Sequence, residues 1–412
     1  MNGNNRKGMS AGAKLFIAAA LLLAVALANY LYSSGVGLGA AREWKMTDTE
    51  KGVVYDFDAN ADFYSFDAMY FYFCTKDGMR YISSDGNVEW QTTFNLIKPV
   101  MTAKGNMVAV GESRGKNIYV FDSKGLAYSV SLDYPALYFS VNEAGYLAVI
   151  LQLDQGYAVN VYNRSKNVEP YFYTQIYDTL MQPVSAGVSA DGRFAAISVL
   201  DLNVHMTSRV YFYYMNQRDS WTTEAGDGLF AFQEFKNQIA YRVEFMDGNK
   251  TMVATDENIA CYQPGDANKL ELLWNIPLHN EINHLTFYGG SRFAFVTEDK
   301  RLNDDEAADI GVAHIYNMSG ELTGTFPIGR KATYMSMGND AVIVGADRSF
   351  YALDQTGKQI WEYISLQDTR GFLFLGDTNT VLMAGGARAT VMRHERVKAT
   401  ETASEGFIQE KD

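Results

Sequence analysis

The sequence contains only seven prolines and two cysteines among its 412 residues. Proline interrupts the hydrogen bonding of strands, so its scarcity, together with 27 tyrosines and 24 phenylalanines, favours many pleated, half-buried strands. Cys74 and Cys261 are far apart in the chain, and each lies inside an apolar run. We expect both to be buried, unpaired thiols, because free cysteine behaves as a small hydrophobic residue. A disulfide would require their Cα atoms to lie within about 7 Å of each other.

The chain also lacks a basic balance and the short motifs of two common site types. Its formal charge is −13, and its first 32 residues carry three positive charges and no negative one, so the remainder is more acidic still. An acidic surface repels phosphate, which argues against nucleic acid as a partner. No P-loop and no Cys-x-x-Cys pair occurs, so nucleotide and structural zinc chemistry have no support. We predict no catalytic residue, no cofactor site and no metal site.

One long apolar run stands near the N-terminus. Residues 15–32, LFIAAALLLAVALANYLY, carry no charge, and a helix of about 18 to 20 such residues crosses a hydrocarbon core of about 30 Å. Arg6, Lys7 and Lys14 precede the run, so the positive-inside rule places residues 1–14 in the cytoplasm and the rest of the chain outside. We therefore predict a single-pass transmembrane signal anchor and a location in the cell membrane.

A cleaved secretory signal is the alternative interpretation of this run. Small residues around Ala28 have the spacing of a signal-peptidase site. The apolar run is longer than a usual signal core of about 7–15 residues, which favours the uncleaved anchor. No cysteine lies near its end, which excludes a lipoprotein. In both cases the body of the protein is exported.

The body of the chain is organised by a repeated hairpin. Residues 350–363, FYALDQTGKQIWEY, are typical of a strand, a tight turn and a second strand. Weaker copies precede it, with a fifth set at about residues 229–277, a sixth at 282–326 and a seventh at 333–363. Three further strands follow, and residues 53–57 are a candidate for the fourth strand that they lack. Antiparallel hairpins repeated at a near-constant period indicate a β-propeller.

We therefore predict an all-β protein, a single β-propeller of four-stranded blades preceded by one N-terminal transmembrane helix. The count of repeats favours eight blades, with seven as the alternative. Residues 33–52 form a linker in this interpretation, residues 53–394 the propeller, and residues 395–412 a flexible tail.

The seventh repeat resembles a known family pattern. Residues 352–361, ALDQTGKQIW, resemble the tryptophan-docking repeat of quinoprotein-like (pyrroloquinoline-quinone-type) propellers, A-x-D-x-x-T-G-K-x-x-W, although the turn is one residue shorter before Thr356. The resemblance implies that Asp354, Thr356 and Gly357 shape the turn while Trp361 packs between blades. Gly86 and Trp90 repeat the same spacing in the first blade.

The same resemblance does not extend to the enzymes of that family. A quinoprotein dehydrogenase needs a catalytic aspartate, a metal cage and usually a pair of adjacent cysteines, and the sequence has no adjacent cysteines. The chain is more similar to non-catalytic, membrane-anchored bacterial propellers of unknown function.

Three other stretches have a functional and a structural interpretation. Residues 279–284, HNEINH, resemble a zinc motif, but the histidines are five residues apart instead of four, so we expect a surface loop. The acidic residues 298–309 have carboxylates for calcium but not the EF-hand spacing, so we expect a solvated insert. The aromatic runs 70–73 and 211–214 have the residues for stacking on sugars, but in a propeller they more often fill the space between blades.

These observations lead to two hypotheses about function. The first is an extracytoplasmic scaffold that binds a protein partner in a cell-envelope assembly, because the body is exported and poor in catalytic motifs. The second is a ligand-binding sensor or an enzyme acting on an envelope polymer such as a glycan, with its site in the central channel. The second hypothesis predicts carboxylates or histidines clustered at the channel mouth.

Overall fold

The computed structural model describes residues 42–46, 53–54, 61–66, 69–203, 206–215, 228–264, 269–288, 291–299, 310–338 and 341–396. The predicted anchor at residues 15–32 lies outside this part of the chain, as do residues 397–412 of the predicted tail. None of the helices in the described ranges has the length and apolar character needed to cross a membrane.

The chain divides into two compact units. The described part of the smaller unit consists of β1 (Arg42–Met46) and the last residues of β33 (Arg388–Arg396), two strands that are neighbours in one sheet. β1 falls within residues 33–52, the predicted linker. The larger unit, Thr47–Met392, contains the remaining strands.

Eight antiparallel sheets follow one another along the larger unit, and we number them blades 1 to 8. Blade 1 consists of β3 (Asp62–Tyr64), β4 (Tyr70–Thr75), β5 (Gly78–Ser83) and β6 (Val88–Thr93), and blade 2 of β7 (Pro99–Lys104), β8 (Met107–Glu112), β9 (Asn117–Asp122) and β10 (Gly125–Ser131). Blade 3 consists of β11 (Ala136–Val141), β12 (Leu147–Gln152), β13 (Tyr157–Tyr162) and β14 (Phe172–Ile176), and blade 4 of β15 (Met181–Val188), β16 (Phe194–Asp201), β17 (Thr207–Tyr214) and β18 (Leu229–Lys236).

Blade 5 consists of β19 (Ala240–Phe245), β20 (Thr251–Thr255), β21 (Asn258–Pro264) and β22 (Leu270–Pro277), and blade 6 of β23 (Ile282–Tyr288), β24 (Arg292–Asp299), β25 (Ile310–Asn317) and β26 (Leu322–Pro327). Blade 7 consists of β27 (Tyr334–Gly338), β28 (Ala341–Ala346), β29 (Ser349–Leu353) and β30 (Gln359–Ile364), and blade 8 of β31 (Thr369–Leu375), β32 (Asp377–Gly385), β33 and β2 (Val53–Val54). A single 3-10 turn, η2 (Asp247–Asn249), lies between β19 and β20.

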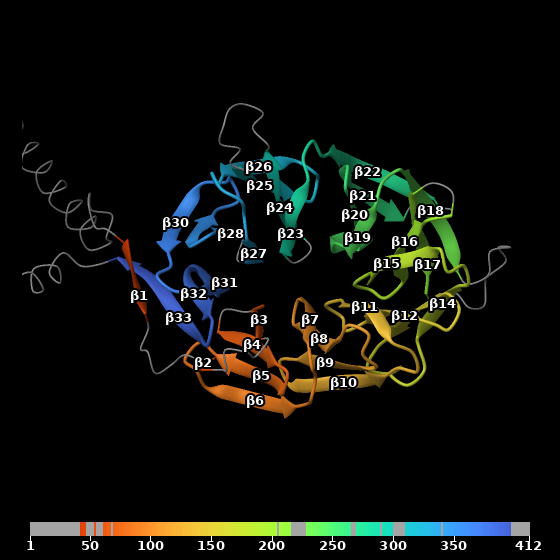
Figure 1. Cartoon of the computed structure of the whole chain (residues 1–412), viewed down its shortest axis with the longest axis horizontal. Coiled ribbons are helices and arrows are strands. Elements are labelled where there is room, and N and C mark those ends of the chain that lie inside the picture. The colour runs from red at the N-terminus through yellow and green to blue at the C-terminus, as the bar shows by residue number, and fades with distance from the viewer. Residues whose placement is uncertain are drawn as a thin grey trace, which may run out of the picture. The chain divides into compact units, whose positions relative to one another are not determined.

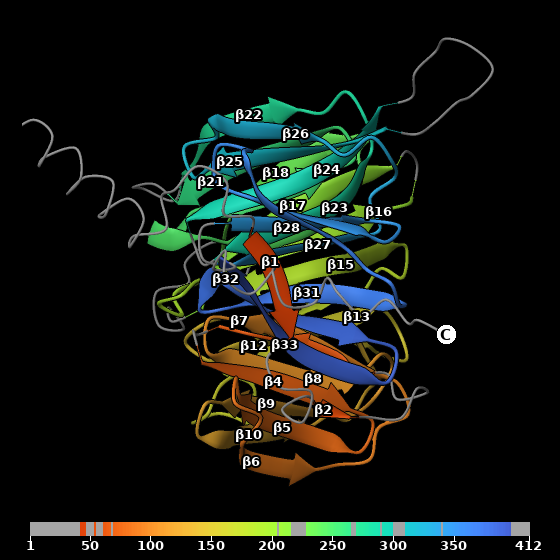
Figure 2. The same ribbon diagram turned by 90° about the vertical axis from the view of Figure 1, so that its left-hand side faces the viewer.

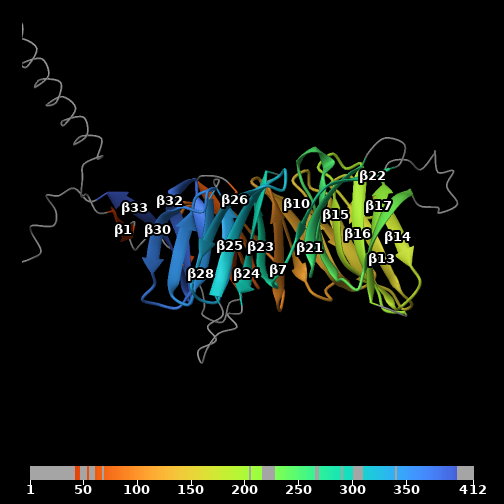
Figure 3. The same ribbon diagram turned by 90° about the horizontal axis from the view of Figure 1, so that it is seen from above.

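The sheets stand around a common axis, with the first strand of each blade innermost (Figure 1). Seen from the side, the strands run across the thickness of the ring (Figure 3). The eight-bladed propeller predicted from the sequence is confirmed, and the seven-bladed alternative is wrong. One repeat boundary was also wrong, because residues 229–236 form β18 of blade 4 and not the start of blade 5. The connection between β17 and β18 at 215–228 is 14 residues long, so it was mistaken for the boundary between two repeats.

Blade 8 is completed by the start of the unit. Val53 of β2 pairs with Ala389 of β33, and Val54 pairs with Arg388, so the predicted closing strand is present over two residues. Blades 8 and 1 lie side by side in Figures 1 and 2. Leu382 and Val391 of blade 8 belong to one buried cluster with Phe71 of blade 1. The ring is therefore closed by hydrophobic packing as well as by backbone pairing.

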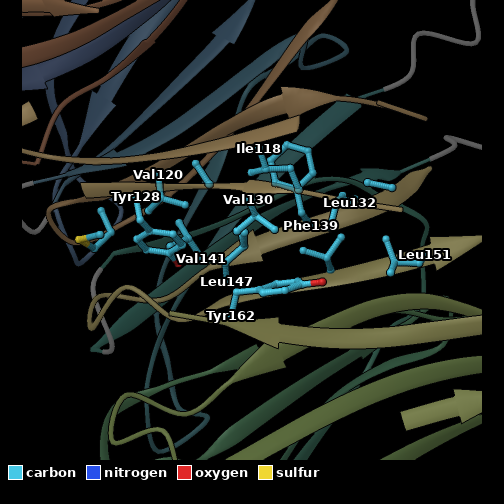
Figure 4. Close-up of a cluster of buried hydrophobic side chains, with 14 of the residues drawn as sticks. Ile118, Val120, Tyr128, Val130, Leu132, Phe139, Val141, Leu147, Leu151 and Tyr162 are labelled. Carbon is cyan, nitrogen blue, oxygen red and sulfur yellow. The ribbon is translucent and has the colours of Figure 1, made fainter. Parts of the chain in front are cut away.

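Neighbouring blades bury apolar side chains against each other. Between blades 2 and 3, Val120 and Val130 face Phe139 and Leu147 in one cluster (Figure 4). Comparable clusters join blades 3 with 4, 4 with 5, 5 with 6, 6 with 7, and 1 with 2. Between blades 7 and 8, the ring of Phe350 lies 4.5 Å from that of Phe372.

Aromatic runs supply much of this packing because strand side chains alternate between two faces. Phe212 of β17 is fully buried in the cluster with blade 5, and the next residue, Tyr213, is buried in the cluster with blade 3. In β4, Phe71 and Phe73 pack toward blade 8 whereas Tyr72 packs toward blade 2. The prediction that these runs fill the space between blades is confirmed.

Replacing Leu382 with alanine tests whether the junction of blades 8 and 1 limits the stability of the ring. Leu382 is 1% exposed, and truncating a buried leucine typically lowers the free energy of unfolding by about 2–5 kcal/mol. Leu366→Ala is the matched control, since that side chain is 92% exposed. Urea denaturation of both variants measures the difference. Equal unfolding midpoints for the two variants would contradict a closed ring.

Candidate functional site

The residues singled out by the tryptophan-docking pattern lie at blade junctions. The Asp354 carboxylate accepts hydrogen bonds from the backbone N–H of Thr356 (2.8 Å) and Lys358 (3.0 Å) and from the Thr356 hydroxyl (2.6 Å), which holds the turn. Gly357 has a φ of 78°, and a Cβ there would lie 2.6 Å from the carbonyl oxygen of Thr325 in β26. This turn therefore needs glycine both for its backbone angle and for its contact with blade 6.

Three tryptophans connect their blades to the following ones. Trp361 donates its indole N–H to the carbonyl of Thr378 in blade 8 at 2.6 Å. Trp90, four residues after Gly86, donates to the carbonyl of Ser123 in blade 2 at 3.0 Å. Trp274 also donates to the next blade, although its turn does not match the pattern. These contacts are structural, so the site must be sought elsewhere.

The centre of the ring contains two adjoining chambers. The lower chamber has a volume of about 390 Å³ and is lined by residues from the innermost strands of all eight blades. The upper chamber, of about 450 Å³, lies toward the starts of these strands, on the face where the loops between successive blades emerge. We call this face the connecting face. Thr102, Tyr138, Arg242 and Leu285 line both chambers and therefore mark their junction.

An ion pair joins strands from opposite parts of the ring in the lower chamber. The Lys104 ammonium in β7 of blade 2 lies 2.8 Å from the Glu244 carboxylate in β19 of blade 5 and also donates to the carbonyl of Phe245. Arg242 approaches the other carboxylate oxygen of Glu244 at 3.5 Å, and its guanidinium lies 4.6 Å from the centre of the Phe287 ring. One carboxylate is thus shared by two cations.

The electrostatics of this group keep Glu244 charged. Burial raises the pKa of Glu244, but the charges and hydrogen bonds of Lys104 and Arg242 outweigh burial and leave the pKa below its ordinary value. Glu244 is the only carboxylate among the described residues that line either chamber. The predicted cluster of carboxylates or histidines is not found among those residues, and the lining is not an apolar plug either.

Hydroxyl groups make up much of the remaining polar lining. Tyr64 donates to the carbonyl of Gly105 at 2.9 Å, and Ser140 donates to the carbonyl of Ala186 at 2.7 Å. Burial raises the pKa of Tyr138, an effect to which Glu244 adds. These phenols stay protonated at neutral pH, so they act as hydrogen-bonding groups and not as bases.

The mouth of the upper chamber is shaped by β-bulges. The pairing of the first and second strands shifts by one residue at Leu137, Tyr241 and Asn283, and all three residues line this chamber. Bulges redirect side chains and often occur next to binding sites. The sequence gives no local signal for them, because an extra residue does not change the apolar pattern of a short strand.

The other candidates from the sequence have no site of their own. His279 lies in a loop as predicted, but residues 282–284 belong to β23, where the His284 ring is 3.3 Å from the carbonyl of Ala332. The described part of the acidic stretch, Glu298 and Asp299, ends β24, where Glu298 pairs with Lys331 at 3.1 Å, while residues 300–309 lie outside the described ranges. Within those ranges no group of three or more metal-binding side chains gathers.

The remaining features of the sequence are its two cysteines and a Gly-x-Ser-x-Gly pattern that occurs twice. Cys74 and Cys261 are buried and free, as predicted, and burial raises the pKa of both thiols to about 12. Residues 111–115, GESRG, fit the Gly-x-Ser-x-Gly pattern of serine hydrolases, as do residues 8–12 outside the described ranges. Ser113 lies between two strands, β8 and β9, whereas a nucleophile elbow joins a strand to a helix.

Comparison with known proteins places this fold in a family. A model described as a family of unknown function (DUF5711) matches residues 44–393. The chain belongs to this family. The match spans all eight blades, so family and propeller coincide along the chain. The description of this family names no quinone chemistry, and in this structure the residues of the tryptophan-docking pattern hold turns and pack blades. No curated protein matches the sequence.

Several solved structures are similar in fold. BamB from Moraxella catarrhalis is 13% identical, covers 86% of this chain and 99% of its own, and has a TM-score of 0.45. The β-propeller domain of Cps50 (Swd1) from Myceliophteria thermophila is 9% identical, with coverages of 86% and 100% and a TM-score of 0.45. Apo AztD from Citrobacter koseri is 10% identical, with coverages of 74% and 86% and a TM-score of 0.46. The site must therefore be interpreted from its own residues.

The lowered pKa of Glu244 makes stability depend on pH. Because its pKa is lower in the folded than in the unfolded chain, the unfolded chain binds more protons near the usual carboxyl pKa, and stability falls as pH drops from about 5 through the folded pKa. We expect Glu244→Gln to lose less stability than wild type across this range. At pH 7 the variant should unfold about 1–3 kcal/mol more readily, since Lys104 loses its partner.

Urea denaturation between pH 3 and 7 measures both effects. Glu271→Gln, on the exposed outer strand β22, is the control and should follow wild type. Identical pH slopes for wild type and Glu244→Gln would show that the ion pair does not persist in solution.

Proposed function

We propose that this protein is a membrane-anchored, extracytoplasmic β-propeller that binds a protein partner within a cell-envelope assembly. The observation that carries the proposal is a set of exposed apolar side chains on the connecting face, two of which line the upper chamber. We call this set the apolar rim; it consists of Ile97, Val100, Tyr134, Tyr177, Leu180, Leu202 and Tyr241.

The apolar rim lies on the connecting face, at or between blades 1 to 5. Val100 and Tyr241 line the upper chamber. Leu180, in the loop before blade 4, is adjacent to Leu202, whose backbone N–H donates to the Leu180 carbonyl at 3.0 Å. Exposed apolar side chains gathered on one face are typical of protein-binding surfaces. Tyrosine is also enriched at such surfaces, which fits Tyr134, Tyr177 and Tyr241.

The channel favours binding over catalysis. Hydrolysis of a glycan typically uses two carboxylates with separate acid and base roles. Glu244 is held ionised by Lys104 and Arg242, so it is a poor proton donor, and no second carboxylate lies among the described lining residues. A ligand-binding sensor remains the second candidate function, favoured by the two adjoining chambers at the axis.

Leu180→Glu should abolish recovery of the partner. The full-length chain, crosslinked in native membranes and purified in detergent, is expected to bring down a reproducible protein from wild type. A charge in the apolar rim opposes burial of that surface and should reduce recovery at least tenfold. Leu272→Glu is the matched control, because Leu272 is also exposed but lies on the outer strand β22. A partner recovered equally with both variants would contradict binding through the apolar rim.

Deleting residues 1–32 should release the propeller from the membrane. The run at residues 15–32 supports an anchor by its length and lack of charge. We expect carbonate-washed membranes to retain the full chain but not the deletion variant. In cells that make the full chain, we expect external protease to reach the propeller. A mature N-terminus directly after Ala28 would favour the cleaved signal, and a propeller inaccessible to external protease would contradict the proposed location.

A further inference from the structure

Arg242 lies at the junction of the two chambers, and most of its N–H donors make no hydrogen bond to the described part of the chain. The guanidinium has five N–H donors. Its contacts within the described part of the chain are the 3.5 Å approach to Glu244 and the face of the Phe287 ring. Glu244 has its shorter contact with Lys104, at 2.8 Å. Arg242 is also 40% exposed, whereas Lys104 is 13% exposed, so Arg242 is the cation that a ligand in the upper chamber meets.

The charges around the chambers leave a net positive centre. Lys104, Arg242 and Glu244 are the charged residues among the described lining, which gives an excess of one cation. Glu298 lies behind Asn283, to which it is hydrogen-bonded, but its charge is matched by Lys331. This positive centre lies inside a chain with a formal charge of −13. The complementary ligand therefore carries one anionic group, and a carboxylate matches the planar guanidinium.

The upper chamber selects what is attached to that carboxylate. Its wall is largely apolar and can pack against an apolar side chain. The lining combines aliphatic and aromatic residues: Val100, Met101, Leu137, Ile282, Leu285, Tyr138, Phe139 and Tyr241. Each innermost strand is also the end strand of its sheet, but hydroxyls of the neighbouring innermost strand already bond several of its backbone groups. The Ala186 carbonyl accepts from Ser140, and the Val243 N–H in the strand of Arg242 donates to Ser185. Arg242 and the apolar wall, and not a strand edge, are therefore the groups that hold a ligand here.

We propose that the upper chamber binds the C-terminal end of a partner polypeptide, with its terminal carboxylate on Arg242 and an apolar last side chain against the apolar wall. This inference rests on the proposed function, because it identifies which part of the protein partner is recognised. The apolar rim then contacts residues of the partner that precede its C-terminus.

Fluorescence polarisation with defined peptides tests the inference on the full-length chain in non-ionic detergent. The probe is a pool of fluorescein-labelled octapeptides that end in leucine, valine or phenylalanine with a free carboxylate. The same pool with a carboxamide end should bind at least tenfold more weakly. Arg242→Gln should weaken binding of the free-acid pool by a similar factor, and Arg242→Lys should lose less because it keeps the charge.

The control variant removes a matched arginine elsewhere. Arg330 is 65% exposed and paired with Asp347 at 3.0 Å outside both chambers, so Arg330→Gln should bind as wild type does. If Arg242→Gln fails to fold, two measurements still test the inference. These are the comparison of the acid and amide pools on wild type and the affinity of the Arg242→Lys variant.

Three outcomes would overturn the inference. Equal affinity for the acid and amide pools would show that the terminal carboxylate is not recognised. Failure of wild type to bind either pool would show that the chamber does not take a peptide C-terminus. Binding of oligoglucuronate in place of the peptides would assign the chamber to another ligand. If the peptides fail while Leu180→Glu still abolishes partner recovery, this inference is wrong and the proposed function stands.

Discussion

The structure depends on every blade having two apolar faces that must both be covered. In β17, Phe212 packs toward blade 5 and the adjacent Tyr213 toward blade 3, and the other central strands distribute their side chains in the same way. A row of such sheets leaves an apolar face exposed at each end unless the last sheet meets the first. The pairing of Val53 with Ala389 and the cluster around Leu382 satisfy this requirement.

Closure of the ring also determines what can meet at the axis. Lys104 and Glu244 are 140 residues apart and belong to blades that do not adjoin, yet their side chains pair because both lie on innermost strands. A largely buried ion pair contributes little to stability compared with apolar packing of the same volume, because removing the charges from water offsets their attraction. Apolar packing would therefore stabilise this position as well as the ion pair does, and the charges agree with the binding role proposed for the channel.

Local patterns predicted the parts of the fold that depend on local contacts. The turn at Asp354 is held by hydrogen bonds to residues two and four positions later, and the fixed spacing from Gly357 to Trp361 places the indole at the blade junction. The start of blade 5 could not be placed, because a 14-residue connection separates β17 from β18. Arg242 was also missed: its strand, AYRVEF, looks like any other, and only the closed ring brings it to the channel.

The bulges show how a repeated framework carries a specific site. Five blades have their extra residue near the start of the innermost strand, and these residues differ in kind: Leu137, Val184, Tyr241, Asn283 and Arg370. A bulge residue is left out of the regular pairing, so its side chain is less constrained by the packing between blades. The mouth of the upper chamber can therefore vary in chemistry while the buried clusters stay the same. In the proposed ligand site, the bulge residues Leu137, Tyr241 and Asn283 line the same chamber as Arg242, which keeps its regular pairing with Ala254. The site therefore combines residues that break the regularity of the strands with residues that keep it.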